Sequence, residues 1–248
     1  VVVYKENGRY CSFPHIIKIN NKLIAVFRRA SNFSVQAALK GTHTHHDPDS
    51  EICLIESHDS GLSWDEKTFQ VVYKSEYGVN DPSLTLLRDG TLLLRFVALK
   101  ITKSLELDHF PKKIFSHRAE HGLVSEVVNN LLLSSVDNGT TWNYHSEIRC
   151  DQIGPSCSRD PLIELEDGSL IAPVYTGAPQ RSDISWSLRS FDRGLTWGEP
   201  SIIGIDENGK FSERHGINYN ETSLLSMGNG ELLALVRGDE TFHTTDEF

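Results

Sequence analysis

One eight-residue pattern occurs three times, and it constrains the fold more than any other feature of the chain. The pattern is Ser-x-Asp-x-Gly-x-Ser/Thr-Trp, at residues 57–64, 135–142 and 190–197. These residue types suit a tight turn between two strands. Gly adopts a positive φ, the Asp side chain accepts backbone N–H groups, and Trp covers the turn with an apolar ring. The repeat therefore predicts three similar strand–turn–strand units, and it says little about catalysis.

A second repeat consists of two apolar runs joined by a two-residue turn. Its four copies begin at Pro14, Pro82, Pro161 and Thr222. Three of the turns are Asp-Gly or Asn-Gly, which are favoured in hairpins because both residues can take φ > 0. The flanking runs are rich in Leu, Ile and Val, as buried strands are. We therefore expect a β-hairpin at each copy.

The two repeats together define a larger unit, which is a hairpin followed by a strand, an octet turn and another strand. Four strands are the content of one β-propeller blade. The sequence predicts an all-β fold with three complete four-stranded blades and the first hairpin of a fourth, about three and a half blades. Because closed propellers have about 4–8 blades, we expect residues 1–248 to form a single β-propeller domain that is incomplete at its C-terminal end.

Composition limits the function classes. The chain has 24 Lys and Arg against 34 Asp and Glu, a net charge of −10, which argues against a nucleic-acid partner. No apolar run approaches the roughly 18 residues of a membrane span. The four cysteines form no C-x-x-C pair, so we expect free buried thiols and no zinc site. A single disulfide is the alternative, and the cellular compartment stays open.

The octets resemble Asp boxes, and with the hairpins they make the whole chain similar to the sialidase (neuraminidase) superfamily. The resemblance implies a six-bladed propeller that acts as an exo-glycoside hydrolase on a terminal, acidic sugar. The family's site has three arginines that grip the substrate carboxylate, an Asp acid/base, a Tyr nucleophile and a Glu that takes the tyrosine's proton. Guanidinium forks suit a carboxylate, and a neutral Tyr avoids repulsion by the substrate's own charge.

The resemblance carries over to several residues. Glu221 matches the family's base, and Arg237 matches an arginine that closes the same hairpin. The first arginine of the triad is replaced by Ser12, although the following Pro14 is kept. Arg159, at the same repeat position in the third unit, is one candidate substitute.

Arg28 and Arg29 end the first hairpin at the repeat position of Arg237, so either could also replace the missing arginine. Alternatively, both are solvated or paired with acidic neighbours. Tyr175 falls at the same repeat position and could stack on a sugar, but we do not expect it to be the nucleophile. The resemblance implies that the nucleophilic Tyr and the third Arg lie beyond the last residue of this chain.

The acid/base is expected in the loop at 41–51, where Asp47 or Asp49 would fill the role. The adjacent His46 could tune or assist proton transfer near neutral pH. The His-x-His-His-Asp run at 43–47 also offers metal ligands, but ligands without distant partners seldom define a site. We therefore predict neither a metal nor another cofactor, and a solvated polar loop is the third interpretation.

Asp81 and Asp160 occupy the strand-start position of Glu221 in the repeat. They could bind sugar hydroxyls, or they could cap the turn before a proline, and the sequence favours neither interpretation.

Two other functions remain open for the whole chain. One is a glycosidase or lyase acting on a different sugar, which Ser12 favours, and the other is a non-catalytic propeller that binds glycan or protein.

Overall fold

The computed structural model describes residues 1–40, 45, 47–103, 116–119, 123–178, 181–206 and 215–242. The fold is 60% strand and 4% helix, which confirms the prediction of an all-β chain. It divides into two compact units, one comprising Val1–Phe110 and Ser116–Glu147 and the other Pro111–Phe115 and Ile148–Phe248. The expectation of a single domain stays a prediction.

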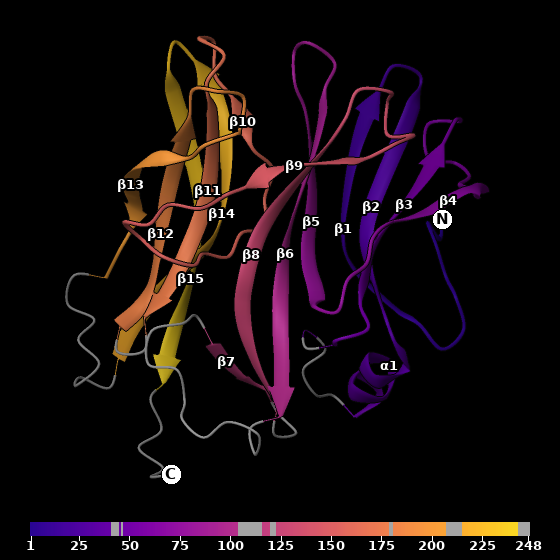
Figure 1. The fold of residues 1–248 in the computed structure, drawn as a ribbon, viewed down its shortest axis with the longest axis horizontal. Helices are drawn as coiled ribbons and strands as arrows, with labels where there is room; N and C mark the ends of the chain where they lie inside the picture. The colour runs from indigo at the N-terminus through magenta and orange to yellow at the C-terminus, as the bar shows by residue number, and fades with distance from the viewer. Residues whose placement is uncertain are drawn as a thin grey trace. The chain divides into compact units, whose positions relative to one another are not determined.

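The first unit contains two antiparallel sheets, whose strands can be followed in Figure 1. The first sheet has the order β1 (Tyr10–Ile19), β2 (Lys22–Ala30), β3 (Glu51–Ser57), β4 (Asp65–Tyr73). A helix, α1 (Asn32–Leu39), connects β2 to β3. The second sheet has the order β5 (Gly78–Leu86), β6 (Leu92–Lys103), β8 (Leu123–Ser135), β7 (Ser116–Ala119), and β9 (Asn143–Glu147) also pairs with β8. The short β7 is thus an addition to the four strands that the repeat predicts.

The second unit contains one complete sheet and one hairpin. The sheet has the order β10 (Ile163–Glu164), β11 (Leu170–Ala178), β12 (Arg181–Ser190), β13 (Gly198–Gly204). The hairpin consists of β14 (His215–Gly228) and β15 (Glu231–Phe242). Three up-and-down sheets followed by a hairpin are the arrangement that the two sequence repeats predict, and they are blades of a β-propeller.

The three octet turns share one hydrogen-bond pattern. Ser57 Oγ donates to Asp59 Oδ1 (2.9 Å) and accepts from the backbone N–H of the turn glycine (2.9 Å). Ser63 donates to Asp59 from its backbone N–H (2.8 Å) and its hydroxyl (2.6 Å). The turns at 135–142 and 190–197 repeat each of these bonds. The expected capping by Asp is confirmed, and the hydrogen bonds from Ser63 lower the pKa of Asp59 to about 2.

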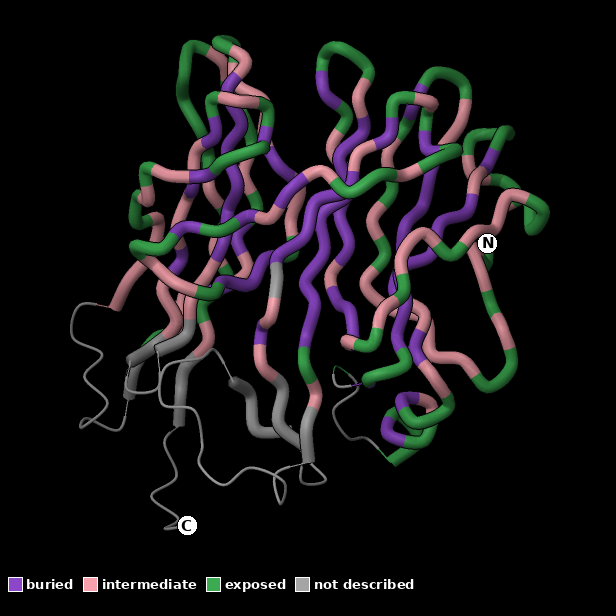
Figure 2. Tube along the Cα trace, viewed as in Figure 1, coloured by how far each residue is buried: buried purple, intermediate pink, exposed green. Residues whose placement is uncertain are grey.

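The core of the first unit lies along its central strands. Residues 24–28 of β2, 51–55 of β3 and 92–99 of β6 are buried without interruption, and Figure 2 shows these stretches in purple. The apolar side chains on one face of these strands form a shared cluster with residues of β5 and β8, while Ala25, Phe27, Cys53 and Ile55 on the other face of β2 and β3 form a second cluster. Each Leu or Ile buried in this way contributes about 1.5–3 kcal/mol. Continuous apolar runs in the sequence therefore correspond to strands that are buried on both faces.

A β-bulge interrupts three of the hairpins at corresponding places. The pairing register shifts between Ser12 and His15, between Asn80 and Ser83, and between Tyr219 and Thr222. At each bulge two residues lie opposite one residue of the partner strand. In the first two bulges Phe13 and Asp81 adopt positive φ values of 54° and 53°, which non-glycine residues seldom do. Bulges redirect side chains and are frequent beside active sites.

The four cysteines are free. Cys53, Cys150 and Cys157 are buried, as expected, whereas Cys11 is only half-buried. Burial raises the pKa of Cys53 to about 12, so its thiol is inert at neutral pH. In the part of the chain that the structure describes, no helix has the length and apolar character needed to cross a membrane.

Candidate functional site

In the second unit, the carboxylate of Glu221 lies between two arginines. Its Oε2 accepts from Arg159 Nη1 at 3.0 Å and is 3.3 Å from Arg237 Nη1. Glu221 is in the bulge of β14, Arg237 lies opposite on β15, and Arg159 precedes β10. The arginine side chains are 47% and 54% exposed, against 24% for Glu221. The structure thus brings together three of the predicted site residues, with accessible guanidinium groups around a more protected carboxylate.

Two further side chains hold this cluster in place. Asn220 Oδ1 accepts from the backbone N–H of Glu221 (2.8 Å), and its Nδ2 donates to Asp239 Oδ2 (3.1 Å). Asp239 in turn accepts from Arg237 Nε, with distances of 2.9 and 3.1 Å to its two oxygens. Because Arg237 also contacts Glu221, the four residues form a closed ring of polar contacts. Sequence reasoning missed Asn220 and Asp239, although their places beside Glu221 and Arg237 in the chain were a usable signal.

Asp183 on β12 joins the same group. Its backbone N–H donates to Asn218 Oδ1 (2.9 Å), and its carboxyl group accepts a hydrogen bond from Asn220. Burial, together with the negative charge of Asp239, raises its pKa to about 6, although the hydrogen bond from Asn220 opposes the rise. Asp183 therefore changes its charge close to neutral pH. No motif surrounds it in the sequence, so only the packing of β12 against β14 reveals it.

Two other predicted residues also belong to the second unit. The backbone of Tyr175 on β11 exchanges two hydrogen bonds, each 2.9 Å long, with the backbone of Cys157. Cys157 lies two residues before Arg159 in the chain. The side chains of Tyr175 and Asp160 are half-buried. Their assignments as substrate-binding residues stay predictions.

Arg28 is a candidate that lies inside the first unit. It is 0% exposed, and its Nη1 and Nη2 reach Ser12 Oγ (3.5 Å) and the His45 carbonyl oxygen (3.4 Å). Burial lowers its pKa to about 10, although the negative charges of Asp47 and Asp81 oppose this effect. The guanidinium group that contacts Ser12 is therefore buried, and in this arrangement it binds protein groups.

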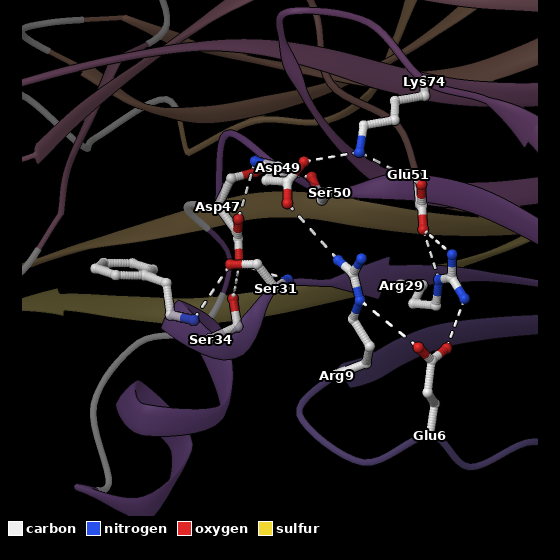
Figure 3. A network of polar contacts seen from close by, with 11 residues as sticks. Glu6, Arg9, Arg29, Ser31, Ser34, Asp47, Asp49, Ser50, Glu51 and Lys74 are labelled. Carbon is white, nitrogen blue, oxygen red and sulfur yellow. Dashed lines mark hydrogen bonds and ion pairs between the residues drawn. The ribbon is translucent and has the colours of Figure 1, made fainter.

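Arg29 does not share these contacts of Arg28 and belongs to the polar network that Figure 3 shows. It makes ion pairs with Glu51 and Glu6, and its guanidinium lies 4.8 Å from the centre of the Phe69 ring. Burial alone would lower the pKa of Arg29, but hydrogen bonds to Tyr4 and Glu51 raise this pKa above its usual value. Two carboxylates and an aromatic ring already surround this guanidinium, which favours a structural role.

Asp47 and Asp49 have opposite environments. Asp47 is 1% exposed, and its carboxylate accepts from Ser31 N (2.9 Å), Ser31 Oγ (2.8 Å), Ser34 Oγ (2.8 Å) and Asp49 N (3.0 Å). Burial alone would raise its pKa, but these hydrogen bonds lower it. A general acid needs an accessible carboxyl that keeps its proton near the working pH, so this environment favours a structural role at the start of α1.

The Asp49 side chain is 53% exposed and makes an ion pair with Lys74 Nζ at 2.8 Å, with Arg9 Nη1 3.7 Å away (Figure 3). Of the two acid/base candidates, Asp49 is the accessible one, and its role stays a prediction. His46 lies outside the described residues. Among the residues that the structure describes, no group of three or more His, Cys, Asp or Glu could hold a metal ion.

Asp81 and Glu221 differ in their position within the bulge. The repeat alignment placed them together, whereas the pairing register makes Asp81 the first bulge residue of β5 and Glu221 the second bulge residue of β14. Likewise, Arg28 pairs with Ser12 just before its bulge, while Arg237 lies directly opposite the bulge of β14. The repeat alignment is therefore off by one residue here. The three bulges are the same size, so they do not cause the offset, but β14 has a second register shift between Ser226 and Gly228, which adds a residue that the sequence pattern does not show.

Comparison with protein families and with curated protein sequences finds no match. Comparison with solved structures shows the class of fold, since neighbours at low sequence identity include propeller glycoside hydrolases, both sialidases and an arabinanase. The chain therefore has a sialidase-like β-propeller fold.

Three of these structures illustrate the similarity. A Dyadobacter fermentans protein of unknown function is 25% identical with a TM-score of 0.73, over 96% of this chain and 65% of that one. The alpha-L-arabinanase of Penicillium chrysogenum is 17% identical with a TM-score of 0.61, over 92% and 57%. The NanB sialidase of Streptococcus pneumoniae is 12% identical with a TM-score of 0.63, over 96% and 50%. The chain thus spans about half to two thirds of the length of these proteins.

Proposed function

We propose that this chain carries part of the active site of a sialidase-like exo-glycoside hydrolase, which releases a terminal acidic sugar from a glycoconjugate. The observation that carries the proposal is the position of Glu221 between Arg159 and Arg237. Two guanidinium groups, each about half exposed, converge on one carboxylate. A substrate carboxylate is the group that such donors bind best, through charge-assisted hydrogen bonds.

The roles follow from the chemistry of an acidic sugar. Arg159 and Arg237 bind and orient the substrate carboxylate. Glu221, held between them, accepts the proton of a neutral nucleophile such as a Tyr hydroxyl, because an anionic nucleophile would be repelled by the substrate. Fixing these groups before the substrate arrives removes part of the entropic cost of reaching the transition state.

A glycosidase acting on another sugar is the second candidate, and Ser12 and Arg28 favour it. Ser12 replaces an arginine that the sialidase resemblance implies, and the neighbouring Arg28 is buried against protein groups. A weaker carboxylate clamp suits a neutral sugar better. In both cases a carbohydrate is the partner.

The test is fluorophore release by the full-length protein from an α-linked sialoside, an α-L-arabinofuranoside and a β-glucuronide. We expect turnover of the sialoside and a loss of about 10²–10⁴-fold in Glu221→Gln, the usual range for a general base. Glu231→Gln, which changes an exposed Glu at the start of β15, is the matched control and should keep full activity. Circular dichroism and thermal unfolding confirm that both variants fold.

Three results would count against the proposal. Release from a different substrate alone assigns the site to another sugar. If the folded protein turns over none of the substrates, the result favours a non-catalytic propeller that binds glycan or protein. Full activity in Glu221→Gln removes Glu221 from the catalytic residues.

A further inference from the structure

The ring around Glu221 couples its side chain to a buried neighbour on another strand. The ring runs from the Glu221 backbone N–H through the Asn220 amide, Asp239 and Arg237 back to the Glu221 carboxylate. Asn220 is 9% exposed, so its amide orientation is set by these partners. Because Asp239 binds Nε of Arg237, the guanidinium is fixed with Nη1 towards Glu221.

Asp183 enters this ring at Asn220. Asn220 has one acceptor oxygen and an NH₂ group with two donors. The oxygen takes the Glu221 N–H, and the NH₂ group serves both Asp239 and Asp183. Two carboxyl groups thus share one amide in a half-buried site, where like charges interact more strongly than in water.

We propose that Asp183 is a positioning residue of this site: its charge, transmitted through Asn220 and Asp239, sets how firmly Arg237 is held and therefore how well it binds a substrate carboxylate. With Asp183 neutral, Asp239 is the only carboxylate on the Asn220 amide, and Arg237 can turn part of its charge to the ligand. With Asp183 ionised, the added negative charge holds Arg237 within the ring and repels an anionic ligand. The inference rests on the proposed function for the identity of the ligand.

The ionisable neighbours support this direction. On the strands around β12, the described ionisable side chains are Tyr175 on β11, Glu199 on β13, Tyr219 and Glu221 on β14, and Glu231, Arg237 and Asp239 on β15. Glu199 lies near the far end of β12, where Arg189 pairs with Gly198. Burial is the main cause that raises the pKa of Asp183 to about 6, and of these side chains Asp239 is the one whose charge contributes to the rise. The change in charge therefore falls within a pH range in which the protein can be studied.

The first measurement is the affinity of the full-length protein for free sialic acid by isothermal titration calorimetry from pH 5 to pH 8. We expect the wild-type affinity to weaken at least about fivefold over this range, the lower end of usual coupling between two sites. In Asp183→Asn the pH dependence should disappear, with an affinity near the wild-type value at pH 5. Asp167→Asn, which removes an exposed carboxylate in the β10–β11 turn, should behave like wild type. An unchanged pH dependence in Asp183→Asn overturns the proposal.

The second measurement needs no ligand and separates this inference from the proposed function. Carboxyl ¹³C chemical shifts report the titration of Asp183, with Asp183→Asn identifying its signal. Asp239→Asn removes a like charge and should lower the titration midpoint of Asp183, and Arg237→Gln removes the counterion of Asp239 and should raise it. A midpoint that moves in neither variant overturns the coupling. If the midpoint moves but sialic acid does not bind, the coupling stands and the proposed substrate is wrong.

Discussion

Replacing Asp183 with Asn is expected to stabilise the protein at pH 8 and to have little effect at pH 4. The carboxyl group has a pKa near 3.8 in the unfolded chain and about 6 in the folded protein, so the folded state binds the proton more tightly. Well below pH 3.8 the group is neutral in both states. As pH rises through 4–6, the unfolded chain ionises first, and the free energy of unfolding falls until the folded state has ionised too.

The magnitude follows from the two pKa values. The difference between 3.8 and about 6 corresponds to about 3 kcal/mol. Asp183 keeps some contact with solvent, which weakens the repulsion from Asp239, so we expect a net effect of about 1–2 kcal/mol. Asn has nearly the same shape as Asp and can still accept from Asn220, so the substitution removes the charge with little change in packing.

The assay is urea unfolding at pH 4, 5, 6, 7 and 8 for the wild type, Asp183→Asn and Asp167→Asn. The stability difference between Asp183→Asn and wild type should grow from a small value at pH 4 to its full value at pH 7. Asp167 is a control of opposite sign, because hydrogen bonds from Ser169 lower its pKa. Its replacement should cost stability at pH 7 and less as pH falls towards its lowered pKa. A stability difference that does not vary with pH in Asp183→Asn would refute the reasoning.

Three other predictions concern the scaffold, and urea unfolding checks each of them. Trp197→Ala should destabilise the protein by about 3–5 kcal/mol because Trp197 is only 8% exposed. Trp142→Ala should cost less because the Trp142 side chain is only partly buried. Equal costs would contradict this ranking. Asp47→Ala should cost at least about 2–3 kcal/mol, since it leaves buried donors at the start of α1 unsatisfied, and a neutral result would show that water satisfies them. Gly139 and Gly90 share a φ of 88°, but a Cβ at Gly139 meets a side chain atom at 3.2 Å. Gly139→Ala should therefore be more destabilising than Gly90→Ala, and the reverse order would argue against close packing at the octet turn.

The octet turns were predictable from sequence because their interactions are local. The hydroxyl of Ser57, the carboxylate of Asp59 and the donors of Ser63 lie within seven consecutive residues. Such bonds depend on the turn itself and not on distant strands, so the same eight letters produce the same geometry three times. The four repeat strands of each sheet were predictable for a related reason, since two hairpin runs and an octet specify four consecutive antiparallel strands, whereas the extra strand β7 was not.

The environment of the site was not predictable to the same degree. Asp183, Asn220 and Asp239 lie on three different strands, and no local pattern connects them. The contrast between Asp47 and Asp49 is also hidden in the sequence, because the two residues are neighbours in one polar loop. What separates them is the start of α1, where Ser31 and Ser34 supply donors to Asp47.

The four arginine candidates show how burial separates residues that the sequence cannot rank. Arg28 is completely buried, and Arg29 is 13% exposed and paired with two carboxylates. Neither can bind a substrate carboxylate unless it gives up existing contacts. Arg159 and Arg237 are half-exposed and share one carboxylate, so a ligand can reach them at a small desolvation cost. The bulge of β14 places Glu221 opposite Arg237, whereas in the first hairpin an apolar residue, Phe27, lies opposite the bulge.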